Sequence, residues 1–245
     1  MLRSDASPSE DADPSRHDRS KGIVVVTGGA SGLGAAVADL VSRRGGTPVV
    51  LDLRPPAGAG AHEIVDLADS ASTEQAVRRT AERYGRLDAV VTCAGIDVPG
   101  ALIDTPTQQW ERIVAVNLLG TAAVVRAALP HLERSHGAVV TIASTLGHRA
   151  VADATAYCAS KFGVVGFTRA LMAEYKGRVA VTLVTPGGMQ TAFFDDRDDR
   201  YKPGPDALLA DPCHVAAAVI TALAQPLGCE LKELVVAGPT ETSWP

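Results

Sequence analysis

Residues 22–34 read GIVVVTGGASGLG, an apolar run that passes directly into a glycine-rich turn. The run predicts a buried parallel strand, and residues 32–44 have the spacing of a helix. Glycines at this junction let the backbone turn tightly, so that a pyrophosphate can approach the N–H groups that open the helix. We therefore expect a phosphate-binding turn. Its predicted contacts are Gly28, Ser31, Gly32, Leu33 and Gly34.

The same alternation of apolar runs and helical segments continues along the chain. Further strands are predicted at 47–52, 62–66, 87–92, 137–143, 178–184 and 232–237. Further helices are predicted at 72–84, 107–133, 155–175 and 212–224, with the second of these broken. Right-handed crossovers between such strands give an α/β fold, a doubly wound (Rossmann) parallel sheet of about seven strands with helices on both faces.

The chain divides into a polar leader and one domain. Residues 1–20 are rich in Ser, Asp, Pro and Arg and nearly free of apolar side chains, so they are predicted to be a disordered tail. Residues 21–245 are predicted to form a single domain. Its one long irregular region, 187–210, is expected to be a mobile substrate loop or lid.

Composition argues against several classes of function. The formal net charge of −5 disfavours nucleic-acid binding and leaves a small molecule as the expected partner. The four cysteines lack metal-ligand spacing, so neither a metal site nor a disulfide framework is expected. No apolar stretch approaches the roughly 20 residues of a membrane helix, and there is no signal-like core, so a cytoplasmic protein away from membranes is predicted.

The end of the second strand bears on the choice of cofactor. Asp52 lies where a carboxylate can accept hydrogen bonds from the hydroxyls of an adenosine ribose, and it would repel a 2′-phosphate. Arg54 could attract that phosphate, but Ser31 and Leu53 add no further cation. We therefore expect NAD, with NADP the less favoured alternative.

Tyr157 and Lys161 are four residues apart in a predicted helix, so their side chains project from nearly the same face. An ammonium beside a phenol favours the phenolate, and Tyr157 is therefore expected to exchange protons near neutral pH. Ser144 follows the fifth strand. Its hydroxyl is expected to hold the substrate oxygen beside Tyr157.

Taken in order, these motifs resemble the classical short-chain dehydrogenase/reductase family over nearly all of residues 21–238. The matching segments are TGGASGLG (27–34), Asp52, Asp66-Leu67, CAG (93–95), Asn117, Ser144, YCASK (157–161) and PGGMQT (186–191).

The resemblance implies roles for individual residues. The implied catalytic residues are Asn117, Ser144, Tyr157 and Lys161, with Asn117 helping to hold a water relay behind Lys161. The implied cofactor contacts are Asp66 and Leu67 at the adenine, Cys93, Ala94 and Gly95, Tyr157 and Lys161 again, Pro186 and Gly187 beside the nicotinamide, and Thr191 at its carboxamide.

Two features depart from the family pattern. Cys93 stands where the family has an asparagine that braces the central strands. The C-terminal LVVAGPTETSWP resembles the 3-hydroxy acid or serine dehydrogenase branch, which commonly prefers NADP. Because that preference conflicts with Asp52, it does not set the substrate.

A substrate pocket is predicted only from nearness in sequence to these positions. Its candidates are Asp97, Val98, Thr145, Leu146, His148, Met189, Phe193 and Phe194. Among them, His148 could bind an anionic or hydroxyl group or lie exposed in a turn.

The sequence as a whole predicts an oxidoreductase that transfers a hydride between NAD(H) and a small secondary alcohol or ketone, with Tyr157 as acid and base. The alternatives are an NADPH-dependent carbonyl reductase, a redox-neutral epimerase with bound NAD, and a non-catalytic dinucleotide sensor. Broad apolar faces at 107–133 and 155–175 predict subunit pairing. The family resemblance implies a homotetramer, and a dimer stays open.

Overall fold

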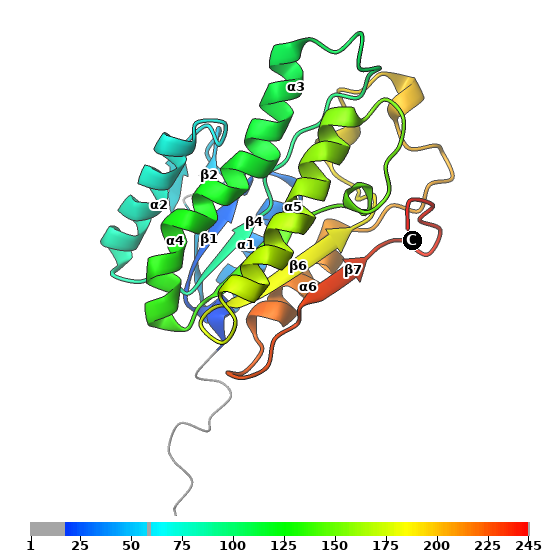
Figure 1. Cartoon of the computed structure of the whole chain (residues 1–245). Helices are drawn as coiled ribbons and strands as arrows, with labels where there is room; N and C mark the ends of the chain where they lie inside the picture. Colours follow the sequence, from blue (N-terminus) through cyan, green and yellow to red (C-terminus); the bar gives the residue numbers. More distant parts are fainter. Residues whose placement is uncertain (1–17, 58–59, 245) are drawn as a thin grey trace, which may run out of the picture.

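The computed structural model describes residues 18–57 and 60–244, and within them the chain forms one parallel sheet in the order β3-β2-β1-β4-β5-β6-β7 (Figure 1). The strands are β1 (Ile23–Thr27), β2 (Thr47–Asp52), β3 (His62–Ile64), β4 (Ala89–Thr92), β5 (Ala138–Ile142), β6 (Ala180–Pro186) and β7 (Glu233–Val236). Strand order reverses between β1 and β4, so the neighbouring connections leave on opposite faces and open a crevice at the carboxyl ends. The predicted doubly wound α/β fold is confirmed.

Helices cover both faces of the sheet. They are α1 (Gly32–Arg43), α2 (Ser70–Tyr84), α3 (Thr107–Val114), α4 (Thr121–Ser135), α5 (Thr155–Glu174) and α6 (Pro212–Leu223). Helices α2, α4 and α5 pack on one face, whereas α1 and α6 pack together on the other (Figure 1).

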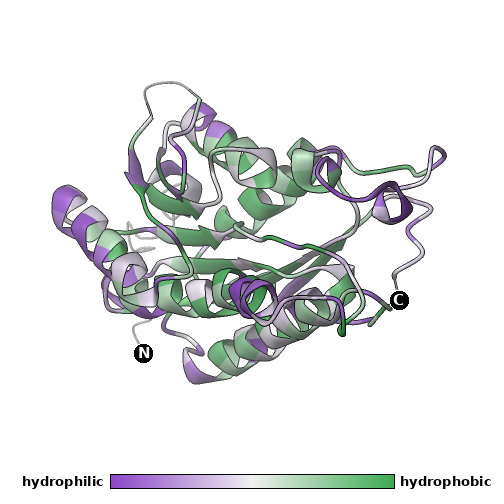
Figure 2. Ribbon diagram, turned by 90° about the horizontal axis from the view of Figure 1, so that it is seen from above, coloured by the Kyte–Doolittle hydropathy of each residue, from purple (hydrophilic) through white to green (hydrophobic). Residues whose placement is uncertain are grey.

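The central strands are apolar because both of their faces are covered. Val24 and Val26 belong to one core cluster and Val25 to the other, and all three are fully buried. Viewed from above, the hydrophobic strands lie between helices whose polar residues face outward (Figure 2). Alternate residues of one strand thus supply both cores.

The helical segment predicted at 107–133 is continuous and not broken. A π-helical turn, η4 (Ala115–Gly120), joins α3 to α4 without a gap. Gly120 is required there, because a Cβ would lie 2.7 Å from the Leu67 carbonyl oxygen. By length and composition alone, Thr107–Ser135 could cross a membrane; its most apolar window is 61% buried against the rest of the fold.

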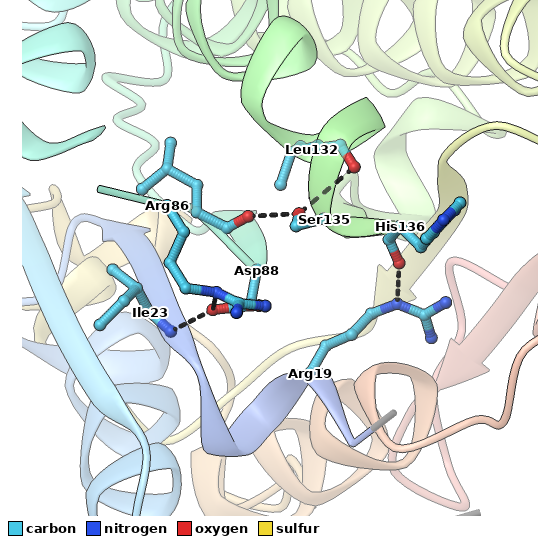
Figure 3. A network of polar contacts seen from close by, with 8 residues as sticks. Arg19, Ile23, Arg86, Asp88, Leu132, Ser135 and His136 are labelled. Atoms are coloured by element: carbon cyan, nitrogen blue, oxygen red, sulfur yellow. Dashed lines mark hydrogen bonds and ion pairs between the residues drawn. The ribbon is translucent and has the colours of Figure 1, made fainter. Parts of the chain in front are cut away.

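Ordered structure begins before the predicted domain boundary at residue 21. A short helix, η3 (Arg19–Lys21), is capped by Asp18, and Arg19 and Ser20 are buried. Arg19 donates hydrogen bonds at 2.9 Å to the carbonyl oxygens of His136 and Gln225, and the first of these is drawn in Figure 3. The predicted disorder is therefore wrong for residues 18–20, because these bonds anchor them. Residues 1–17 lie outside the described residues.

Asp88 completes the same edge of the sheet, where the strands begin. Its carboxylate accepts a hydrogen bond from the Ile23 backbone at 2.8 Å and pairs with Arg86 (Figure 3). Gly22 lets this carboxylate approach, since a Cβ at that position would lie 2.2 Å from it.

The predicted substrate loop contains short ordered pieces. Helices η6 (Ala192–Phe194) and η7 (Asp199–Tyr201) lie within it, and a parallel bridge joins Met189 to Ala210 at its base. Mobility of this loop stays a prediction.

Candidate active site

The glycine turn joins β1 to α1 at the crevice. Gly28 has a φ of +68°, and a Cβ there would lie 2.8 Å from the backbone of Ala94. A Cβ at Gly34 would lie 2.3 Å from the Gly28 carbonyl oxygen. Both glycines are therefore fixed by close approach of backbone to backbone.

The start of α1 is suited to an anion. Ser31 precedes the helix and makes no side-chain capping hydrogen bond, whereas Asp69 and Asp211 cap α2 and α6. The N–H groups of the first turn of α1 are thus left for an external acceptor, and the helix dipole favours negative charge there. The donors present fit a dinucleotide pyrophosphate.

Asp52 lies at the end of β2 and supports this turn. Its Oδ2 accepts a hydrogen bond from the Ala30 backbone at 3.0 Å, and its Oδ1 accepts one from the Arg54 backbone at 3.1 Å. Asp52, Leu53 and Arg54 all line the cleft above the turn. Each carboxylate oxygen has further lone pairs, so Asp52 can still accept from a ribose hydroxyl.

Asp66 and Leu67 form the far end of the cleft. Arg112 of α3 donates to Asp66 Oδ2 at 3.0 Å. The backbone N–H of Ala68 donates to its Oδ1 at 3.0 Å. These hydrogen bonds and the charge of Arg112 hold the pKa of Asp66 below its usual range despite the opposing effect of burial.

The segment Cys93-Ala94-Gly95 follows β4 and borders the glycine turn. The Ala94 N–H donates to Thr27 Oγ1 at 3.0 Å, which ties the ends of β1 and β4 together. Burial raises the pKa of the Cys93 thiol to about 12. The Cys93 thiol therefore stays neutral.

Asn117 lies in the π-helical turn and binds the chain that leaves β4. Its amide donates to the Ile96 carbonyl at 2.9 Å and to Ser160 Oγ at 3.0 Å, and its Oδ1 accepts from the Ile96 N–H at 2.8 Å. The Asn117 side chain thus positions the backbone beside the cleft. Its place in a water relay stays a prediction.

Tyr157 is 9% exposed in α5 and lines the cleft together with Ser144. Burial raises the pKa of the Tyr157 phenol to about 12, and the neighbouring Ser144 hydroxyl opposes this rise. Asp97 adds to the rise and Arg197 opposes it. The sequence predicts that Tyr157 exchanges protons near neutral pH. The residues of the protein alone do not lower the pKa of Tyr157 that far, because desolvation outweighs the neighbouring charges.

Lys161 lies one helical turn from Tyr157 and is 4% exposed. Its ammonium donates to the Ile142 carbonyl at 2.9 Å and lies 5.7 Å from the centroid of the Tyr157 ring. Burial lowers the pKa of Lys161 to about 8. The cation is thus held behind the phenol and away from solvent.

One cleft of about 1800 Å³ at the carboxyl edge of the sheet joins these parts. The predicted cofactor residues all line it, as do Ser144, Tyr157 and Lys161. Of the predicted substrate residues, Asp97, Val98, Thr145, Leu146, Met189, Phe193 and Phe194 line it as well.

His148 does not line the cleft, so its predicted place in the pocket is wrong. Its Nε2 is hydrogen bonded to Thr185 Oγ1 at 3.1 Å, and its ring packs edge-on against Trp244 with centroids 5.2 Å apart. These two contacts turn the ring toward β6 and the C-terminal segment.

Thr191 lies at the entrance of the substrate loop and caps η6. Its Oγ1 accepts from the Phe193 N–H at 3.4 Å, and its methyl group would lie 3.4 Å from a Cβ at Gly32. The loop therefore starts directly beside the glycine turn. Contact with a nicotinamide carboxamide stays a prediction.

Sequence reasoning missed the segment beyond β7. Glu241 accepts a hydrogen bond from the Gly188 N–H at 2.8 Å, and Ser243 donates to Thr145 Oγ1 at 2.7 Å. Residues 240–243 consequently line the cleft. No local motif marks these contacts, because they are made across the sheet edge.

Arg197 was missed too, although its position carries a signal. It is the one cation in the run DDRDD (195–199), and its side chain is only 13% exposed. An arginine among four aspartates that turns inward must have a partner there, which is Asp97.

Comparisons with known proteins identify relatives of this chain. A family model described as short chain dehydrogenase matches residues 22–202. D-threitol dehydrogenase of Mycolicibacterium smegmatis is 34% identical over 218 residues, which cover 81% of this chain and 84% of that protein. L-fucose dehydrogenase of Mus musculus is 30% identical over 243 residues, which cover 91% and 89%.

A solved structure shares the fold. It is the alcohol dehydrogenase of the archaeon Thermococcus sibiricus, complexed with 5-hydroxy-NADP, with a TM-score of 0.77 and 23% sequence identity. The match covers 88% of this chain and 95% of that one.

Proposed function

The chain belongs to the short-chain dehydrogenase/reductase family, and from that premise we propose that it oxidises small secondary alcohols to ketones with NAD, using Tyr157 as the base. As a member of this family it is an oxidoreductase that acts on small molecules. The two relatives described above are named for a polyol and a sugar, which supports an alcohol carbon as the reacting centre.

The observation that carries the proposal is the grouping of Ser144, Tyr157 and Lys161 at one wall of the cleft. In the oxidative direction the Tyr157 phenolate accepts the hydroxyl proton of the alcohol, while the Ser144 hydroxyl holds the same oxygen. An NAD bound in this cleft would supply the hydride acceptor, so that loss of the proton to Tyr157 and of a hydride from the carbinol carbon would leave a ketone. In the reverse direction Tyr157 returns the proton to the ketone oxygen.

The buried Lys161 supports the charge on this phenolate. Desolvation alone keeps Tyr157 protonated, so a phenolate needs positive charge nearby at the moment of transfer. The Lys161 ammonium, fixed by the Ile142 carbonyl, supplies one such charge at a constant distance. Because Lys161 also lines the cleft, the same ammonium can contact the cofactor.

Replacing Tyr157 with Phe tests the assignment. We expect NAD-linked alcohol oxidation to fall by at least about 10³-fold, because general acid–base catalysis by one side chain contributes about 10²–10⁴-fold. The affinity for NADH, followed by nicotinamide fluorescence, should change by less than about threefold. Residual turnover within tenfold of the wild type would show that another group moves the proton.

Asp52 supports NAD over NADP. A 2′-phosphate at the end of β2 would meet the Asp52 carboxylate, which is held in place by the Ala30 and Arg54 N–H groups. We expect NADH to bind at least about 10-fold more tightly than NADPH, a difference of about 1.4 kcal/mol. Asp52→Asn should narrow this preference without abolishing it.

The matched control is Asp66→Asn, which removes a second carboxylate at the same cleft. Asp66 is paired with Arg112 and should influence both cofactors alike. Tighter binding of NADPH by the wild type would mean that Arg54 outweighs Asp52, and the NADPH-dependent carbonyl reductase would then become the better description.

A further inference from the structure

A buried ion pair lies beside Tyr157 and has no part in the mechanism above. Arg197 of the substrate loop pairs with Asp97 of the segment after β4, with 2.9 Å between Arg197 Nη2 and Asp97 Oδ2. The two side chains are 13% and 4% exposed, and both residues line the cleft.

Each partner keeps one polar atom unused. Among the described residues, Asp97 Oδ1 and Arg197 Nε are buried without a hydrogen-bond partner. Buried polar atoms are nearly always bonded, because leaving one unsatisfied is costly. A pair that served only to fasten the loop would gain by satisfying both atoms, so a free donor on Arg197 and a free acceptor on Asp97 indicate a ligand.

Aromatic rings hold the pair close to the reacting centre. The Arg197 guanidinium lies 4.7 Å from the centroids of both Phe193 and Phe194. The Phe193 ring in turn lies 5.8 Å from the Tyr157 ring. The Phe193 ring therefore neighbours both the guanidinium and the phenol, and the charges of Asp97 and Arg197 both act on the pKa of Tyr157.

The chemistry of the pair selects its ligand. An ion pair is neutral overall, so a carboxylate ligand would meet the charge of Asp97 and an ammonium would meet that of Arg197. A hydroxyl group is both donor and acceptor, and it can accept from Arg197 Nε while it donates to Asp97 Oδ1. A neutral hydroxyl satisfies both orphaned atoms at once.

We propose that Asp97 and Arg197 bind a second hydroxyl group of the substrate, so that the preferred substrates are diols and larger polyols. This inference rests on the proposed function, since it places the second hydroxyl relative to the carbinol that Tyr157 deprotonates. The aromatic rings of Phe193 and Phe194 then cover the carbon chain between the two oxygens.

Two pairs of alcohols test the proposal directly. Butan-2-ol and butane-2,3-diol differ only in a second hydroxyl, as do pentan-2-ol and pentane-2,4-diol at one carbon greater separation. We expect kcat/KM for at least one diol to exceed that of its mono-ol by about 10- to 100-fold, because the mono-ol leaves the buried polar atoms unpaired. No variant is needed for this comparison.

A double variant tests whether the ion pair of Asp97 and Arg197 causes the preference for diols over mono-ols. Asp97→Leu with Arg197→Met replaces the ion pair by apolar side chains, so that neither charge is left buried alone. We expect the diol to mono-ol ratio of kcat/KM to fall to about 1. Circular dichroism and NADH binding check that the variant is folded.

The control is Tyr201→Phe. Tyr201 fastens the same loop through a 2.9 Å hydrogen bond from its hydroxyl to Asp153 Oδ2. Loosening the loop there should affect the diol and the mono-ol alike and leave the ratio unchanged.

The outcomes separate the two proposals. Equal kcat/KM for the diols and the mono-ols in the wild type would overturn the polyol inference and leave alcohol oxidation standing. A double variant that lowers kcat/KM for both kinds of substrate by the same factor would show that the pair acts on the loop or on Tyr157 and does not bind a second hydroxyl, which would also overturn the polyol inference. A wild type that binds NADH but oxidises none of the four alcohols with NAD or NADP would overturn the proposed function, and the inference with it.

Discussion

At the scale of the residue, the chemistry depends on how strongly burial opposes charge. Tyr157 has its pKa raised to about 12 and Lys161 has its pKa lowered to about 8, in both cases because desolvation disfavours the charged form. Alcohol oxidation uses the phenolate, so its rate should rise with pH up to about 8, above which Lys161 loses the proton whose charge supports that phenolate. Ketone reduction uses the phenol and should not show that rise.

Ser144→Ala should move this pH profile to higher pH. The Ser144 hydroxyl lowers the pKa of Tyr157, so its removal leaves burial less opposed and makes the phenolate scarcer at any given pH. The measurement is kcat/KM for alcohol oxidation between pH 6 and 10, with the midpoint or the rising limb shifted upward. Far below the pKa of Tyr157 this shift is a drop in alcohol oxidation by the same factor at each pH, so ketone reduction, which uses the phenol, serves as the control. An equal drop in both directions would show that Ser144 only holds the substrate.

The sequence predicts the positions of some residues of the site better than those of others. Tyr157, Lys161 and Ser144 lie together because helical spacing and a strand end dictate it, and these positions were predicted. His148 was placed wrongly because its partners, Thr185 and Trp244, come from distant segments. Nearness along the chain says little about which way a side chain turns.

At the scale of the element, the short N-terminal helix η3 shows how a few bonds extend an ordered domain. Composition predicts disorder up to residue 20, since residues 18–20 contain no apolar side chain. Arg19 nonetheless bridges the end of α4 and the segment after α6 through two backbone carbonyls. Hydrogen bonds between a side chain and a distant backbone leave no periodic signal in the sequence.

Arg19→Ala should lower the free energy of unfolding by about 1–3 kcal/mol, since it removes two charge-assisted hydrogen bonds and leaves two carbonyls to find other partners. Urea denaturation followed by circular dichroism measures this. Arg43→Ala is the control, because the Arg43 side chain is 72% exposed and, within the described part of the chain, pairs only with Asp39 on the same helix; it should cost less than about 0.5 kcal/mol. Equal losses in the two variants would contradict a structural role for η3.

At the scale of the whole molecule, the sequence predicts the sheet but does not predict how the loops around the cleft contact one another. Each strand is an apolar run with its own signal, and the right-handed crossover rule then allows few arrangements. The cleft closes through contacts between loops, such as Arg197 with Asp97 and Glu241 with Gly188. These pairs are 100 and 53 residues apart, and neither belongs to a repeating pattern.

The hydrogen bond between Glu241 and Gly188 affects the order in which the parts of the site form during translation. During translation the glycine turn emerges early, and Tyr157 follows after about two thirds of the chain. The hydrogen bond that Gly188 donates at the start of the substrate loop, however, can form only when a residue 53 positions later has left the ribosome. A nascent chain can therefore form most of its nucleotide cleft while the substrate side is still open, and the enclosed site is among the last features of the molecule to be completed.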